Sequence, residues 1–166
     1  MKRLLVDVNV ALDVLLARAP HAGAGTRLWT AIEERRATGL LPAHGVTTLF
    51  YLLARAWGAA AARRTVGDTL LVFAVAPVDG AVLAQALALG WPDFEDAVCA
   101  AAASAAGCDV IVTRDPAGFR RSSVPAVHPA AALALLDEEG GPGRVAERAR
   151  AAYMARPRSR RATRPR

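Results

Sequence analysis

Several features are scarce in this sequence, and each scarcity excludes a class of protein. Cysteine occurs only at Cys99 and Cys108, a spacing that fits neither a metal-binding pair nor a disulfide framework, so we expect a reducing compartment, the cytoplasm. Aromatic residues make up 5% of the chain and hydrophobic residues 54%, so Ala, Leu and Val must build the core. The longest uninterrupted apolar run, residues 70–78, is too short to cross a bilayer. We therefore expect a soluble globular protein that does not insert into a membrane.

Acidic residues are nearly absent from the C-terminal end. From residue 144 to residue 166 the sequence has nine arginines and a single acid, Glu147, whereas the preceding 143 residues have 12 basic and 14 acidic side chains. We expect a domain in residues 1–138 that buries its own core and an Arg-rich, partly disordered extension in residues 139–166. The extension would either gather RNA electrostatically or be a solvated segment without a specific role.

Short apolar runs alternate with longer Ala- and Leu-rich runs along the first 138 residues. The longer runs have helical periodicity, and Gly107 follows the run at residues 94–106, where a left-handed residue would end a helix. Strands that alternate with helices predict an α/β fold around a mainly parallel sheet. The short runs are the expected strands, at residues 3–8, 39–44, 71–78, 109–114 and 124–127.

Carboxylates follow two of the expected strands. Asp7 ends the first strand and Asp115 follows the fourth, and ligands of parallel sheets bind outside the carboxyl ends of the strands. A third acidic segment, WPDFEDAV, opens the helix at residues 94–106, with Asp93 as its N-cap and Asp96 one turn on. Carboxylates that meet without a cation repel one another, and oxygen-only ligands suit Mg²⁺ or Mn²⁺ rather than zinc. The spacing therefore favours a divalent-metal site of the kind that supports phosphodiester hydrolysis.

The polar residues also have purely structural interpretations. Asp93 would serve first as a helix cap, while Asp13 and Asp109 are most simply surface or turn residues. Arg114 would either contact a substrate phosphate or form a salt bridge with a neighbouring acid. The histidines are scattered, with no spacing suited to a catalytic triad or a zinc site, at His21, His44 and His128.

Two stretches carry a family resemblance. LLVDVNVALDVLL near the N-terminus and DFEDAVCAAAASAAGCDVIVTRDPAGF in the second half resemble the PIN-domain family, especially the VapC-like toxins of bacterial toxin–antitoxin pairs. The resemblance covers roughly residues 1–136. It implies a three-layer α/β/α sandwich and a Mg²⁺- or Mn²⁺-dependent endoribonuclease that cleaves RNA. It also implies a homodimer that a separately encoded antitoxin protein holds inactive.

The resemblance suggests roles for the acids. Asp7 stands at the family's first acid, Asp96 at its helix acid and Asp115 in the motif after the fourth strand. These three aspartates would be catalytic and would hold one metal ion directly or through waters, with Asp93 completing the cluster. Asn9, the usual polar companion of the first acid, would orient Asp7 or a bound water.

One departure from the family pattern concerns Thr48. The family commonly places a glutamate after the second strand, in a pattern like T-L-x-E-L-Y-Y-L-L, and Thr48 takes its place in the matching VTTLFYLLAR. A hydroxyl supplies no charge, so Thr48, like Thr113, would only donate hydrogen bonds near the metal. The alternative is therefore a catalytically weak or inactive PIN-like module that binds RNA or a partner protein. A haloacid-dehalogenase-like phosphatase is disfavoured, because Asn9 stands where that chemistry needs a second aspartate.

Overall fold

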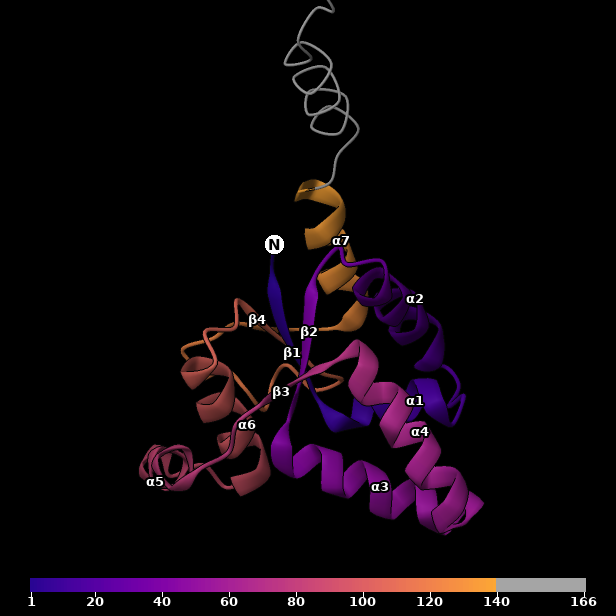
Figure 1. Ribbon diagram of the computed structural model, residues 1–166. Coiled ribbons are helices and arrows are strands. Elements are labelled where there is room, and N and C mark those ends of the chain that lie inside the picture. Colours follow the sequence, from indigo (N-terminus) through magenta and orange to yellow (C-terminus); the bar gives the residue numbers. More distant parts are fainter. Residues whose placement is uncertain (140–166) are drawn as a thin grey trace, which may run out of the picture. The chain divides into compact units, whose positions relative to one another are not determined.

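The computed structural model describes residues 1–139 of the chain (Figure 1). By its contacts the chain divides into a unit of residues Met1–Leu136, which contains the sheet and the candidate site, and a unit of residues Asp137–Arg166. The basic extension predicted at residues 139–166 lies, apart from residue 139, outside the described residues. Among the helices of residues 1–139, none combines the length and the apolar character that a bilayer crossing needs.

The central sheet has five strands in the order β3-β2-β1-β4-β5, and every neighbouring pair is parallel. β1 therefore lies in the middle, between β2 and β4, and all carboxyl ends meet at one edge of the sheet. The strands are β1 Arg3–Val6, β2 Thr38–Pro42, β3 Ala74–Ala76, β4 Val110–Val112 and β5 Ala126–Val127. The prediction of an α/β fold with a mainly parallel sheet is confirmed.

The run at residues 71–78 is only in part a strand, and this prediction is wrong at its start. Leu71 and Val72 continue helix α4 (Ala59–Val72), and β3 begins only at Ala74. Leu71 is 87% exposed, so an apolar residue on the outer face of a helix extended a run that looked like a buried strand. Predicted strands one and two also end early, because helices begin directly after them.

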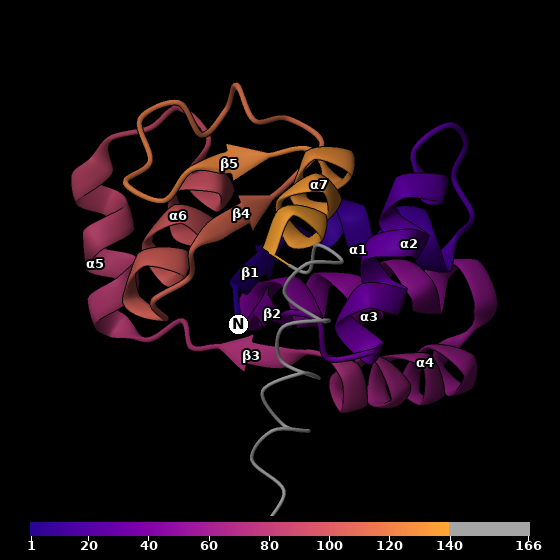
Figure 2. The same cartoon turned by 90° about the horizontal axis from the view of Figure 1, so that it is seen from above.

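Helices cover both faces of the sheet (Figure 2). Along β1, Leu4 and Val6 belong to one buried apolar cluster and Leu5 to the other, as the two-residue period of a strand requires. The second cluster includes α5 (Gly80–Leu89) and α6 (Phe94–Ala105). The predicted three-layer α/β/α sandwich is thus confirmed. The first cluster includes the remaining helices, α1 Val8–Leu15, α2 Ala22–Glu33, α3 Ala43–Trp57, α4 and α7 Pro129–Glu139.

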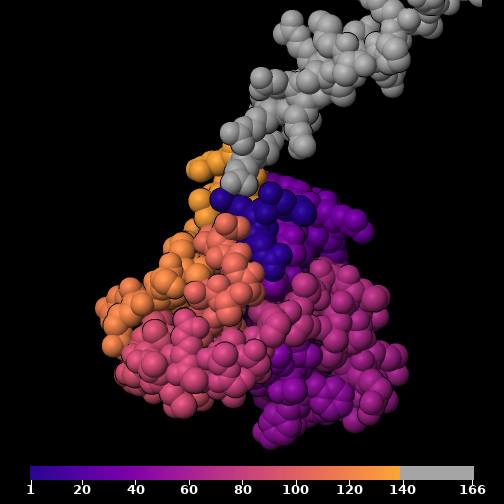
Figure 3. All heavy atoms as spheres, turned by 60° about the vertical axis from the view of Figure 1, so that its left-hand side comes forward, coloured from indigo at the N-terminus to yellow at the C-terminus, as the bar shows by residue number. Residues whose placement is uncertain are grey.

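Alanine dominates the buried face of α6. Every residue from position 97 to position 103 is buried, and five of them are alanines, so the helix packs closely on the sheet. The helix is followed by Gly107 with φ +61°, the left-handed conformation that the sequence predicts there. On the surface, the region of α5 and α6 and the segment after β4 lie side by side (Figure 3). The ring of Trp91, in the loop between α5 and α6, meets the ring of Phe119 after β4. This packing brings the acidic first turn of α6 to the carboxyl edge of the sheet.

Candidate functional site

The acids predicted as a site gather at the carboxyl edge of the sheet. Asp7 follows β1 and residues 113–115 follow β4, and the two strands pair with Val6 beside Val112. The Asp7 backbone N–H continues this pairing by donating to the Val112 carbonyl oxygen at 2.9 Å. Two strand ends that are far apart in the sequence therefore lie side by side, which is where parallel sheets bind ligands.

Asp7 is the most deeply buried acid of this group, with 8% of its surface exposed. Its Oδ2 atom accepts a hydrogen bond of 2.8 Å from the Thr113 hydroxyl. Its Oδ1 atom accepts one of 3.2 Å from the Asn9 backbone N–H, which makes Asp7 the N-cap of α1. These two bonds lower the cost of burying the charge and hold the carboxylate in one orientation.

Thr113 links Asp7 to Asp115. It is 1% exposed, and its hydroxyl oxygen, while donating to Asp7, accepts a hydrogen bond of 3.1 Å from the Asp115 backbone N–H. The Asp115 Oδ1 atom accepts from the backbone N–H groups of Ala117 at 3.1 Å and Gly118 at 3.4 Å. A single buried hydroxyl thus fixes the relative positions of two acids.

Asp96 approaches these acids from the first turn of α6. Its backbone N–H donates to Asp93 Oδ1 at 3.1 Å, so Asp93 is the helix N-cap, as predicted. Gly118 lies against both Asp96 and Asp115, because a Cβ atom at position 118 would be 2.8 Å from Asp96 Oδ2 and 3.5 Å from Asp115 Oδ2. The two carboxylate oxygens are therefore no farther apart than the sum of these distances. A side chain at position 118 would force Asp96 to move.

Negative charge is crowded around Asp96. Partial burial, and then the carboxylates of Asp93, Asp7, Asp115 and Glu95, raise the pKa of Asp96 from 3.8 to about 6. Within residues 1–139, no lysine or arginine lies at ion-pair distance from Asp7, Asp96 or Asp115. The repulsion between these carboxylates is therefore not relieved by a cationic side chain of the described chain.

The donor set fits a divalent cation, although it is not a complete ligand shell. Carboxylate oxygens are the preferred ligands of Mg²⁺ and Mn²⁺, and a cation would relieve the repulsion that raises the pKa of Asp96. In the described part of the chain, no three His, Cys, Asp or Glu side chains converge closely enough to hold one ion together. Mg²⁺ often takes only one or two carboxylates and completes its shell with water and substrate phosphate, which this arrangement allows.

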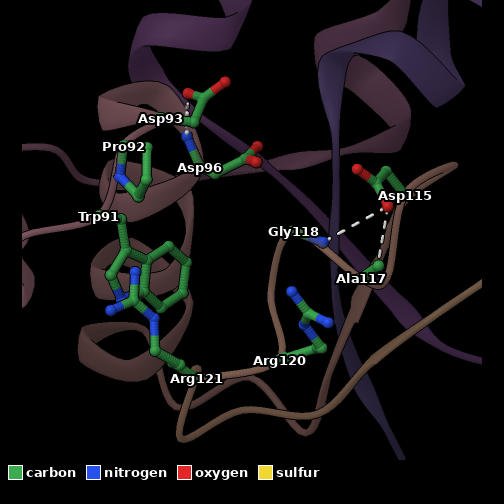
Figure 4. Close-up of a pocket in the computed structure, with 9 residues that line it drawn as sticks. All are labelled: Trp91, Pro92, Asp93, Asp96, Asp115, Ala117, Gly118, Arg120 and Arg121. Carbon is green, nitrogen blue, oxygen red and sulfur yellow. Dashed lines mark hydrogen bonds between the residues drawn. The ribbon is translucent and has the colours of Figure 1, made fainter.

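A pocket of about 590 Å³ opens beside the carboxylates (Figure 4). Asp93, Asp96 and Asp115 lie along one side of it, and Arg120 and Arg121 lie along the opposite side. Its volume is in the range of pockets that bind small molecules. The lining residues are Trp91, Pro92, Asp93, Asp96, Asp115, Ala117, Gly118, Arg120 and Arg121.

Two other predicted site residues occupy different positions. Asn9 lies on the first turn of α1 with an exposed side chain. Arg114 contacts Asp13, with 3.3 Å between Nη1 and Oδ1, so its salt-bridge interpretation is the one that the structure shows. The prediction that Asp13 is a surface or turn residue is wrong, because Asp13 is 1% exposed and also lies 3.9 Å from Arg18 Nη1. Two arginines make the burial of this charge possible.

His44 is near the site although its spacing to the other histidines indicated no role. Its Nε2 atom lies 3.9 Å from Glu95 Oε1 and 3.7 Å from Cys99 Sγ. Burial lowers the pKa of His44 below 6.5, although the carboxylates of Glu95 and Asp7 act in the opposite direction. Thr48 lies one helical turn later, and its hydroxyl donates to the His44 carbonyl oxygen at 3.3 Å. The sequence did contain a sign of this position. His44 precedes Thr48 by four residues, so both lie on the same face of α3, and Thr48 stands where the family has its glutamate.

Comparisons with known proteins agree with this architecture. The sequence model of the PIN domain matches residues 3–117. A similar solved structure is that of VapC20 of Mycobacterium tuberculosis, a sarcin-ricin loop cleaving toxin, with a TM-score of 0.53, 21% identity, and coverage of 65% of this chain and 86% of that chain. Comparison with curated protein sequences gave no significant match.

Two further solved structures share the fold. VapBC2 from Rickettsia felis, bound to a DNA fragment from its promoter, has a TM-score of 0.60 at 12% identity and covers 76% of this chain and 98% of that chain. FitAcB from Neisseria gonorrhoeae has a TM-score of 0.57 at 21% identity and covers 76% of this chain and 97% of that chain. At such identities the likeness concerns the fold.

Proposed function

The chain belongs to the PIN-domain family, and on that premise we propose that it is a metal-dependent endoribonuclease, the toxin of a toxin–antitoxin pair. The observation that carries the proposal is the acidic site. Three aspartates from distant segments meet at the carboxyl edge of the sheet, and no cationic side chain of residues 1–139 neutralises them. A structural neighbour that cleaves the sarcin-ricin loop supports RNA as the substrate class.

One or two of the carboxylates of Asp7, Asp96 and Asp115 would bind one Mg²⁺ or Mn²⁺ ion directly, and the rest would bind it through water. When bound, such an ion polarises a phosphate and lowers the pKa of a bound water, which is the chemistry that phosphodiester hydrolysis needs. Thr113 prepares the site by orienting Asp7 and Asp115 through its hydrogen bonds. Asp93 caps α6 with its Oδ1 atom, and its carboxylate adds to the negative charge that attracts the ion.

Asn9 and Arg114 have more limited roles in this proposal. The backbone N–H of Asn9 orients Asp7, and its exposed side chain would bind a water at the mouth of the site. Arg114 stays with Asp13, so we assign it to the stability of the fold rather than to a substrate phosphate. Thr48 has its hydroxyl bound to the His44 carbonyl and supplies at most a second contact to water.

The proposed partners are RNA, a separately encoded antitoxin and a second copy of the chain, in the cytoplasm. Structural neighbours were solved as toxin–antitoxin complexes, among them one from Klebsiella pneumoniae. We therefore expect a homodimer that an antitoxin binds and inhibits. A small DNA-binding protein encoded beside this gene, which co-purifies with the chain and suppresses its activity, would be the expected antitoxin.

The direct test is cleavage of RNA by the purified full-length chain with Mg²⁺ or Mn²⁺ and with EDTA. We expect cleavage that requires the metal and is lost in Asp7→Asn and in Asp115→Asn. The matched control is Asp68→Asn, which removes an exposed acid of α4 and should leave the rate unchanged. Equal cleavage by the wild type and both site variants would refute the assignment.

A second candidate function is an inactive PIN-like module that binds RNA or a partner protein. The observation that favours it is Thr48, which brings no carboxylate from α3 and whose hydroxyl is directed to the helix backbone. Calorimetric titration with Mn²⁺ distinguishes the candidates, because an inactive module should show no specific uptake. The same titration can be made with Thr48→Glu, which adds the carboxylate that the family has at this position. If α3 lies at the metal site, this variant should bind Mn²⁺ more strongly than the wild type.

A further inference from the structure

The pocket beside the acidic site has a basic side that the proposed metal chemistry does not use. Trp91 stands in the loop between α5 and α6, whereas Arg120 and Arg121 stand in the segment between β4 and β5. All three line the same pocket as the carboxylates (Figure 4). The rings of Trp91 and Phe119 meet edge to face, with centroids 6.1 Å apart, so the two segments are packed together.

Arg120 has the properties of a phosphate ligand. It is exposed, and within residues 1–139 its guanidinium forms no ion pair with a carboxylate. Its backbone N–H donates to the Ala117 carbonyl oxygen at 3.4 Å, so the residue belongs to the same turn as Gly118, which touches Asp96. A guanidinium offers a fork of donors that binds a phosphate through two hydrogen bonds.

The guanidinium of Arg121 lies over the ring of Trp91, and the two stacked groups, here called the Trp91–Arg121 surface, line the pocket together with Arg120. The guanidinium carbon of Arg121 lies 5.7 Å from the centroid of the Trp91 ring, in the range of a cation–π contact. Trp91 is half-buried, and its packing on Phe119 holds its ring in place. Nucleobases stack on both kinds of plane, the aromatic ring and the guanidinium group.

We propose that Trp91, Arg120 and Arg121 form a binding subsite for the nucleotide next to the cleaved bond. Arg120 binds a phosphate of that nucleotide, and its base stacks on the Trp91–Arg121 surface. A pocket of about 590 Å³ has room for one nucleotide. The inference rests on the proposed function for the identity of the polymer and for the position of the cut.

The subsite also explains how an acidic site attracts a polyanion. The carboxylates alone would repel a phosphate backbone, whereas the two arginines across the pocket attract it. When the arginines bind one phosphate of an RNA strand, the adjacent phosphate of that RNA lies at the carboxylates on the opposite side of the pocket. A base that stacks in the pocket must be free of a duplex, so the subsite selects a single-stranded segment and reads little of its sequence.

The test is direct binding of a short, fluorescently labelled single-stranded RNA to the full-length chain, measured by anisotropy in EDTA so that no cleavage occurs. We expect Arg120→Ala to weaken binding about five- to tenfold and to reduce the slope of log K against log salt by about 0.7. Trp91→Ala should weaken binding about tenfold, and Trp91→Phe, which retains a ring, should lose much less. Circular dichroism of each variant shows that the fold is kept.

The matched control is Arg64→Ala, which removes the same charge from an exposed position of α4, a helix of the other layer. Arg64→Ala should bind RNA as the wild type does. Wild-type affinity for Arg120→Ala, or an equal loss for Arg64→Ala, would overturn the subsite, as would equal binding by Trp91→Ala and Trp91→Phe.

Cleavage with Mn²⁺ is measured separately on the same proteins. RNA that is bound through Arg120 and Trp91 but is not cut supports the subsite and refutes the nuclease. RNA that is cut equally well by Arg120→Ala and by the wild type overturns the subsite and leaves the nuclease in place.

Discussion

Two buried aspartates at the carboxyl edge of the sheet have opposite surroundings. Asp7 caps α1 and Asp13 lies within the same helix, and they are 8% and 1% exposed. Asp13 has a cationic partner in Arg114 at 3.3 Å and a second in Arg18 at 3.9 Å. Among the described residues, the donors to the Asp7 side chain are a hydroxyl and a backbone N–H. The same residue type is thus paired with arginines in one region and has no arginine or lysine partner among residues 1–139 in the other.

This difference separates a structural acid from a functional one. The charge of Asp13 is compensated by two arginines at its Oδ1 atom, although its buried Oδ2 atom has no hydrogen-bond partner within residues 1–139. Removal of an arginine would leave more of this charge without compensation. Asp7 instead lies near Asp96, whose pKa is raised by partial burial and by the neighbouring carboxylates. The burial of an aspartate therefore does not by itself indicate a functional site. A buried aspartate without a cationic partner is the better indication of one.

The largest expected difference between the two regions is in RNA cleavage. Asp7→Asn should lower the rate by about 100-fold or more, because even groups that only support metal ligands contribute about 10- to 100-fold. Asp13→Asn should leave the rate per folded molecule unchanged. Initial rates with Mn²⁺, corrected for the folded fraction by circular dichroism, measure both. Equal losses would mean that the two acids serve one function.

The next largest effect is on stability, where Asp13→Asn should cause a larger loss than Asp7→Asn. Asp13→Asn should lower the free energy of unfolding by about 2 kcal/mol, since it breaks a buried ion pair whose arginine remains partly solvated. Asp7→Asn should change it by less than about 1 kcal/mol, because asparagine also caps helices well. Urea unfolding of the metal-free proteins measures both values. A more severe loss for Asp7→Asn would contradict the comparison.

A smaller effect is expected where Thr113 connects Asp7 and Asp115. Thr113→Val keeps the shape but removes the donor to Asp7 and the acceptor for the Asp115 N–H. We expect cleavage to fall about tenfold, and Thr113→Ser, which keeps the hydroxyl, to retain most of the activity. If serine and valine behaved alike, packing rather than hydrogen bonding would be the cause.

The smallest effect concerns the charge on Asp96. Folding raises its pKa to about 6, so ionisation of Asp96 opposes folding. The contribution of Asp96 to stability is therefore most favourable below about pH 4 and declines as the pH rises to about 6. Asp96→Asn removes this cost. In EDTA at pH 8 its Tm should exceed that of the wild type by about 3 °C, a modest rise because solvent screens part of the repulsion. The difference should vanish near pH 4, and a difference that grew toward low pH would refute the crowding.

The fold and the meeting of the acids could be predicted from the sequence. Asp7 and Asp115 follow apolar strands, and a parallel sheet brings strand ends to one edge, so no knowledge of side-chain packing was needed. Asp93 was predictable as a cap because it precedes the first helical residue of α6. The α/β/α layering came from the family resemblance together with the alternation of strands and helices.

Contacts between distant side chains could not be predicted in the same way. The burial of Asp13 depends in part on Arg114, which reaches it from the segment after β4, and periodicity does not reveal such a contact. His44 lies at the site because of the direction of α3, and Arg120 because of the path of the segment between β4 and β5. Leu71 led to the wrong prediction of a strand that starts at residue 71, because an exposed leucine on α4 looks in the sequence like part of a buried strand.

The pairing of β1 with β4 has a consequence for the order of synthesis. The first strand leaves the ribosome early, but Thr113 and Asp115 are translated only after six helices of the fold have been made. Until then the nascent polypeptide has Asp7 without its hydroxyl donor, Thr113, and without the acid of Asp115. A catalyst that acts on RNA would therefore stay incomplete while most of its own message is being read.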